Sequence, residues 1–172
     1  MTEIIKVYKE PIPALRMIGK RYTNADRRDG NFGHCWGQWF ENGWFDVLAA
    51  LGPAKVSDSE HLGFMRCYES EFDSIFEYWI GQFFPPGTVP PEGFGYIDLP
   101  AGELAVAWIR SDDDNEIFSM EYACEKRFQR DGLKWWRDAE GREHFFERYN
   151  ESRFLTPDAD GNVILDYCTY LA

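Results

Sequence analysis

The feature that most constrains the fold is an order of patterns that occurs twice along the chain. Each half has a strand-like alternation, a helix-like apolar spacing and two more strand-like segments. Short motifs recur in the same order, 81 to 89 residues apart: Ile12-Pro13-Ala14 with Leu99-Pro100-Ala101, Phe64/Tyr68 with Phe145/Tyr149, and Phe76-Glu77-Tyr78 with Leu165-Asp166-Tyr167. We therefore predict a tandem duplication with half-repeats over about 3–84 and 94–172.

The predicted elements follow from these patterns. Strands are expected over 3–10, 15–22, 64–69, 75–80, 94–111 with a break at 100–102, 144–149 and 163–170. Helices are expected over 35–51 and 116–131, and the Pro-rich segment 85–93 joins the halves. The sequence thus predicts one α+β domain over 1–172, with two β-α-β-β halves, antiparallel sheets, pseudo-two-fold symmetry and a cleft along the axis.

The first predicted helix carries an apolar stripe that we expect to face the sheet. The stripe consists of Trp36, Phe40, Trp44, Val47, Leu48 and Leu51.

Charge and composition narrow the partners. A formal net charge of −12 opposes phosphate binding, so we expect no direct nucleic-acid contact and favour neutral or cationic partners. The 4 cysteines and 3 histidines are scattered, which predicts no metal site, no disulfide framework and no cofactor. The start lacks a signal-peptide pattern and no apolar run is long enough to span a membrane, which predicts a cytoplasmic protein.

Aromatic residues make up 17% of the chain, more than a core of this size needs. They indicate either a large aromatic core or the walls of a concave ligand site. Candidate walls on the predicted strands are Tyr68, Tyr78, Trp79, Tyr149 and Tyr167, with cross-strand packing as the alternative. Trp108 is expected in the core or the pocket wall, and Trp135 is a candidate cap over the cleft.

Glu147 is the candidate polar anchor. Strand alternation places it on one face with Phe145 and Tyr149, which partly desolvates the carboxylate. Its charged form is then disfavoured unless a cation or a donor pairs with it. Such a group is suited to anchoring a cation or to general acid–base chemistry. The alternative is a glutamate on a solvated face, paired with an arginine.

Several segments together resemble the GyrI-like small-molecule-binding family, whose domain is also the effector-binding module of AraC- and MerR-type multidrug regulators. They are 12–19, 36–44, 78–81, 89–94, 99–102 and 146–149, and the resemblance spans about 4–171. It implies a stand-alone member with SHS2-type halves and an aromatic pocket at their junction. The acid that holds lipophilic, neutral or cationic ligands of drug or toxin type would be Glu147.

The resemblance also implies two other functions. Some stand-alone members hydrolyse strained cyclopropane-bearing genotoxins. In that case Glu147 would be the general acid/base, assisted by Tyr149 or Tyr167. Another member acts on DNA gyrase, so a protein-interaction module that modulates gyrase or a transcription regulator is a further alternative.

Overall fold

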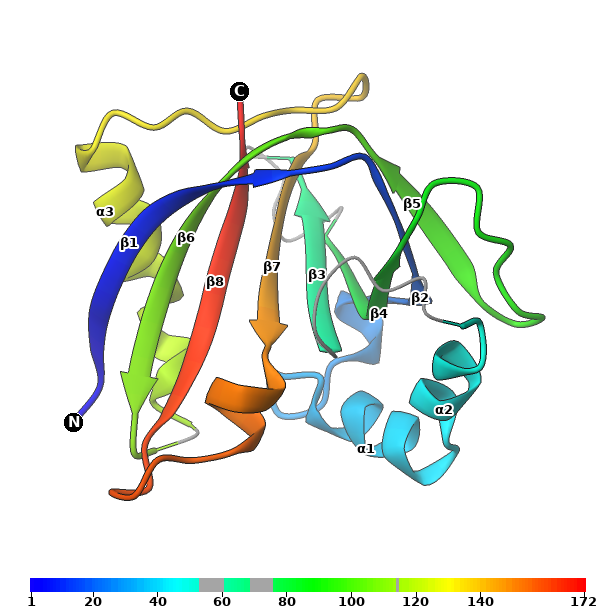
Figure 1. Cartoon of the computed structure of the whole chain (residues 1–172), viewed down its shortest axis with the longest axis horizontal. Coiled ribbons are helices and arrows are strands. Elements are labelled where there is room, and N and C mark those ends of the chain that lie inside the picture. The colour runs from blue at the N-terminus through cyan, green and yellow to red at the C-terminus, as the bar shows by residue number, and fades with distance from the viewer. Residues whose placement is uncertain (53–60, 69–75, 114) are drawn as a thin grey trace.

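The computed structural model describes residues 1–52, 61–68, 76–113 and 115–172. Its described strands form one eight-stranded antiparallel sheet in the order β1-β6-β8-β7-β3-β4-β2-β5 (Figure 1). The strands are β1 (Glu3–Ile12), β2 (Leu15–Thr23), β3 (His61–Cys67), β4 (Glu77–Phe84), β5 (Gly95–Leu99), β6 (Gly102–Ser111), β7 (Glu143–Tyr149) and β8 (Val163–Leu171). The predicted α+β class and antiparallel pairing are confirmed.

The strand order reads the same from either edge after a systematic exchange. If β1 is exchanged with β5, β2 with β6, β3 with β7 and β4 with β8, the new order is the original order read from the opposite edge of the sheet. The two sets of strands meet where β3 pairs with β7, with His61 opposite Tyr149 and Gly63 opposite Glu147. The halves therefore share one continuous sheet instead of forming separate sheets, and a duplication of the chain stays a prediction.

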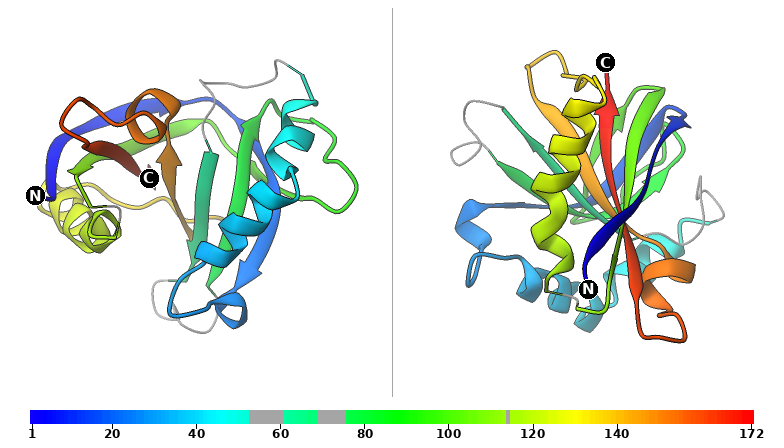
Figure 2. Two further views of the ribbon diagram at one scale, coloured as in Figure 1. Left: turned by 90° about the horizontal axis from the view of Figure 1, so that it is seen from below. Right: turned by 90° about the vertical axis from the view of Figure 1, so that its left-hand side faces the viewer.

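The helices pack on one face of this sheet. They are α1 (Gly33–Glu41), α2 (Trp44–Ala49) and α3 (Glu121–Arg130), with short helical turns η1 (Asn24–Asp26), η2 (Ile117–Met120) and η3 (Glu151–Leu155). Figure 2 shows α1 and α3 on the same side of the sheet, with space between them. Residues of both helices, such as Trp39 and Phe128, join one apolar cluster with the sheet.

The predicted continuous helix over 35–51 is wrong. Gly43 adopts a left-handed conformation with φ of 65°, so α1 ends before it and α2 starts after it as a separate helix. The apolar spacing therefore does not continue from one helix into the next. Phe40 and Val47 of the predicted stripe are 61% and 40% exposed, whereas the buried positions are Cys35, Trp39, Phe45 and Leu48.

Strand alternation separates two apolar clusters, one on each face of the sheet. In β7, which is buried along its whole length, Phe145 and Tyr149 face the helices while Phe146 joins the cluster on the other face. The predicted facing of this strand is thus confirmed. It places Glu147 on the helix side, at the centre of the sheet.

Candidate functional site

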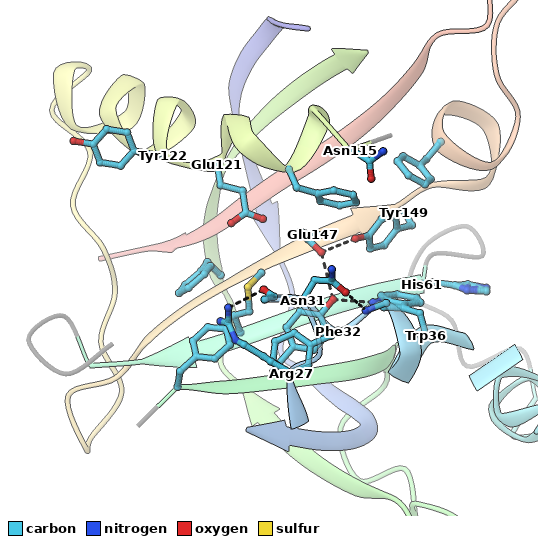
Figure 3. Close-up of a pocket in the computed structure, with 18 of the residues that line it drawn as sticks. Arg27, Asn31, Phe32, Trp36, His61, Asn115, Glu121, Tyr122, Glu147 and Tyr149 are labelled. Carbon is cyan, nitrogen blue, oxygen red and sulfur yellow. Dashed lines mark hydrogen bonds between the residues drawn. The ribbon is translucent and has the colours of Figure 1, made fainter. Parts of the chain in front are cut away.

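A cavity of about 920 Å³ lies over the central strands β3 and β7, between α1 and α3. Figure 3 shows side chains from both strand sets converging on it. Its wall combines aromatic rings with a few polar groups. The lining includes Arg27, Phe32, Trp36, Tyr78, Glu121, Glu125, Glu147 and Tyr149.

Glu147 forms the polar centre of the cavity floor. Its side chain is only 5% exposed, and its Oε2 accepts hydrogen bonds from Tyr149 Oη at 2.5 Å and Tyr78 Oη at 3.5 Å. Trp36 Nε1 in turn donates to Tyr78 Oη at 2.9 Å. This chain of donors connects α1 to β7 and fixes the carboxyl group in place, which offsets part of the cost of burying it.

The two tyrosines stay donors. Burial, followed by the nearby charge of Glu147, raises the pKa of both Tyr78 and Tyr149 well above the ordinary value. Both hydroxyls are therefore protonated at neutral pH. A tyrosine hydroxyl is an uncharged donor, so the pair leaves the negative charge of the site unneutralised.

Gly63 makes room for this arrangement. It lies on β3 directly opposite Glu147. A Cβ atom at this position would lie 2.6 Å from Tyr78 Oη and 2.7 Å from Glu147 Oε2, closer than real side chains approach. The absence of a side chain at Gly63 is therefore a requirement of the site.

Two more carboxyl groups reach the cavity from α3. Burial, followed by the charge of Glu147 and a hydrogen bond with it, raises the pKa of Glu121 well above the ordinary value. Part of Glu121 is exposed to the cavity, but protein groups crowd its carboxyl, which favours the protonated form of this acid beside Glu147. Glu125 accepts from Tyr167 Oη at 3.0 Å, and burial raises its pKa.

Aromatic rings cover the opposite wall. Phe32 stacks on Tyr78 with centroids 4.2 Å apart and an interplanar angle of 2°, and Trp36 meets Tyr149 edge-on at 4.9 Å. The guanidinium of Arg27 lies 5.1 Å from the Phe32 ring centroid. The rim of the cavity is apolar and exposed, formed by Phe40, Phe118, Tyr122 and Leu155. An apolar compound therefore meets a compatible surface from the mouth inward.

The structure brings three of the predicted site residues together, namely Glu147, Tyr149 and Tyr78. Tyr167 lies outside the cavity lining and is connected to the site by the hydrogen bond that it donates to Glu125. Trp79 packs in the apolar cluster on the other face of the sheet, because neighbouring strand residues point to opposite faces.

The other three predicted residues also lie outside the cavity lining. Trp108 packs against that cluster on the far face, with its ring centroid 6.1 Å from that of Tyr8. Trp135 contacts Phe128 edge-on at 6.2 Å and pairs with the end of β8. Tyr68 approaches Gly141 instead.

Sequence patterns missed most of the helix and loop residues of the site. Trp36 belongs to a stripe that was expected to face the sheet, and Phe32 lies between the strand predicted over 15–22 and the helix predicted over 35–51, where no element was predicted. Glu121 and Glu125 did carry a signal: they lie one turn apart and flank Cys124, which is buried against the sheet. Two acids beside a buried helix position indicate a polar pocket under the helix.

Comparisons with solved structures give the fold. SAV2435 bound to tetraphenylphosphonium matches with a TM-score of 0.67 and 14% identity over 98% of this chain and 94% of that one. A candidate transcription regulation protein from Staphylococcus aureus MU50 matches at 0.60 and 15%, over 96% and 97%. An integron cassette protein from the mobile metagenome of Vibrio cholerae matches at 0.57 and 14%, over 99% of both chains. The chain therefore shares the fold of these small bacterial proteins.

The likeness to known proteins is one of structure and does not extend to sequence. No protein-family model matches the chain, and no curated protein matches it. Within the described residues, no helix is long and apolar enough to cross a membrane. In that same part of the chain, no group of three or more His, Cys, Asp and Glu side chains could hold a metal ion.

Proposed function

We propose that the protein binds lipophilic, neutral or cationic small molecules of drug or toxin type in this cavity, with Glu147 as the anchor for a positive charge. The observation that carries the proposal is a buried carboxyl group, held by neutral tyrosine donors, at the floor of an aromatic cavity. A buried carboxylate without a cation is unfavourable. A ligand cation would meet both this charge and the negative faces of the rings.

Two further observations support this proposal. The cavity volume of about 920 Å³ falls within the roughly 300–1,000 Å³ range typical of drug-sized ligand sites. SAV2435, which has the same fold, was solved with tetraphenylphosphonium, a lipophilic cation. We infer that the present chain takes ligands of similar chemistry.

We also propose that the chain forms a cytoplasmic binding domain of the GyrI-like type, with duplicated SHS2-type halves. The strand order supports the duplication because exchanging the two sets of strands gives the same order, read from the opposite edge of the sheet. The position of the cavity over the β3–β7 boundary supports a site built jointly by the halves.

Titration calorimetry with tetraphenylphosphonium tests the binding proposal. The wild type should bind the cation, and Glu147→Gln should weaken binding by about 10- to 100-fold, since an ion pair near a protein surface contributes a few kcal/mol. The same substitution should change little the affinity for triphenylphosphine oxide, a neutral aromatic probe. Because Glu121 adjoins Glu147, the double variant Glu121→Gln/Glu147→Gln should lose more than the single one.

A matched control is Glu92→Gln, which removes an exposed carboxylate outside the cavity and should leave binding unchanged. Equal affinity of wild type and the double variant for the cation would contradict the anchor. Absence of wild-type binding to both probes would contradict the function itself.

A second candidate function is hydrolysis of a strained electrophilic compound. It is favoured by the position of Glu147 beside Glu121, an acid with a raised pKa, and by the Tyr149 hydroxyl at 2.5 Å. Glu147 would take a proton from a water molecule while the oxygen of that water forms a bond to a ring carbon of the substrate. The broken ring bond would leave its electron pair on a conjugated carbonyl oxygen, which Glu121 protonates. Glu147→Gln should then reduce turnover of a cyclopropane-bearing substrate by about 10²–10⁴-fold, and an unchanged rate would exclude this role.

A further inference from the structure

We propose that the cavity prefers organic cations that carry two positive charges, one placed at Glu147 and the other along α3 at Glu121 and Glu125. This inference rests on the proposed function because it concerns the same cavity. It names a class of ligand. It also gives a role to the two carboxyl groups of α3, which a ligand with a single charge at Glu147 would not need.

The geometry separates two negative regions within one space. The carboxyl group of Glu121 extends from α3 towards Glu147 on the cavity floor, as Figure 3 shows, and the charge of Glu147 acts on it. Glu125 lines the cavity one helical turn further along α3 and is held by Tyr167 at 3.0 Å. Residues one turn apart have Cβ atoms about 5–6 Å apart, so the acidic wall extends well beyond the carboxyl of Glu147.

The formal charge of the cavity matches a dication. Among the described residues that line it, three carboxyl groups face one guanidinium, that of Arg27. With histidine neutral, ionisation of all three leaves a charge of −2, whereas a proton on Glu121 leaves −1. A ligand with one charge therefore neutralises the protonated cavity. A ligand with two charges neutralises the fully ionised cavity, so its second charge takes the place of a proton.

The tyrosines and the cysteine around Glu121 do not supply this proton. Those that face it are Glu147 and Tyr149 on β7, Tyr78 on β4, Tyr167 on β8, Arg27 from the loop after η1, and Cys124 and Glu125 on α3. Burial raises the pKa of the three tyrosines and raises that of Cys124 to about 12, so all four stay neutral at pH 6–8. The exchangeable proton therefore belongs to the glutamates.

The aromatic wall suits a rigid ligand of this kind. Phe32 and Trp36 border the same cavity as the acids, so a flat cation can lie against rings on one side and carboxyl groups on the other. Ethidium and propidium form a matched pair of probes. They share one ring system with a fixed positive charge, and propidium adds a quaternary ammonium three carbon atoms away.

Calorimetry of the full chain with both dyes, at pH 6, 7 and 8 and in buffers of different ionisation enthalpy, tests the proposal. Propidium should bind at least about tenfold more tightly than ethidium at pH 8 and release close to one proton. Its affinity should rise by up to about tenfold per pH unit, because one proton is displaced. Ethidium should show little pH dependence.

Glu121→Gln should make the affinities for propidium and ethidium similar and remove the pH dependence of propidium binding. Glu92→Gln should preserve the difference in affinity and the pH dependence. Proton release by the wild type needs no variant, so the proposal remains testable if Glu121→Gln does not fold. If ethidium binds but propidium binds no more tightly and releases no proton, the dication preference is wrong and the proposed function stands. If neither dye nor tetraphenylphosphonium binds, the proposed function itself fails.

Discussion

Gly63→Ala should destabilise the protein although glycine to alanine in a strand ordinarily stabilises by about 0.5–1 kcal/mol. The new Cβ would lie 2.6 Å from Tyr78 Oη and 2.7 Å from Glu147 Oε2. Both atoms are buried and joined in one hydrogen-bond network, so neither can move away freely. Overpacking of this kind costs about 1–3 kcal/mol. We expect a net loss of about 1–2 kcal/mol, with Tm falling by about 2–4 °C for each kcal/mol.

Thermal unfolding followed by circular dichroism measures this loss, and titration with tetraphenylphosphonium measures its effect on the site. Gly102→Ala is the matched control: Gly102 is also a strand glycine, but a Cβ there meets no atom within 4 Å. It should leave Tm unchanged or slightly raised. A Gly63→Ala protein that melts no lower than the control and binds the cation equally well would refute the requirement for empty space opposite Glu147.

Three other substitutions test the surrounding structure. Gly37→Ala, in the exposed interior of α1 where a Cβ meets no neighbour, should stabilise by about 0.5–1 kcal/mol in urea unfolding; a loss would contradict the helix. Because the folded state raises the pKa of Glu121, wild-type stability should fall as pH rises above the unfolded value of about 4.3, by up to about 1.4 kcal/mol per pH unit, and Glu121→Gln should flatten this slope. Burial lowers the pKa of His144 to about 4, so stability should also fall as pH drops from 6.5 towards 4, by up to about 3 kcal/mol, and His144→Gln should lose that dependence.

The sequence predicted the sheet well because its strands have alternating or continuously apolar residues between Pro and Gly breaks. It predicted the first helix poorly. Asn42 and Gly43 lie within an apolar spacing that continues on both sides, so periodicity alone indicates one helix. The left-handed conformation of Gly43 is what divides it, and nothing in the apolar spacing distinguishes a glycine that breaks a helix from one that a helix tolerates.

The same limit applies to the site. Glu147 and Tyr149 could be found because two-residue alternation fixes the face of a strand residue without knowledge of the rest of the fold. Phe32 reaches the cavity because of the path of a loop, and Glu121 because of how α3 lies across the sheet. These placements depend on tertiary packing, which local spacing does not encode.

The two strand sets contribute different chemistry to the cavity, and this difference explains why one site exists where the fold repeats. Glu147, Glu121 and Glu125 all come from the second set and its helix, whereas Phe32, Trp36 and Tyr78 come from the first. At the boundary itself, Glu147 faces Gly63, so one strand supplies the charge and its partner supplies the space. A cation bound between them would meet carboxyl groups on one side and rings on the other. The second half also contributes rings, among them Phe145 and Tyr149, but the wall that faces α3 comes from Phe32, Trp36 and Tyr78, so the site requires both halves.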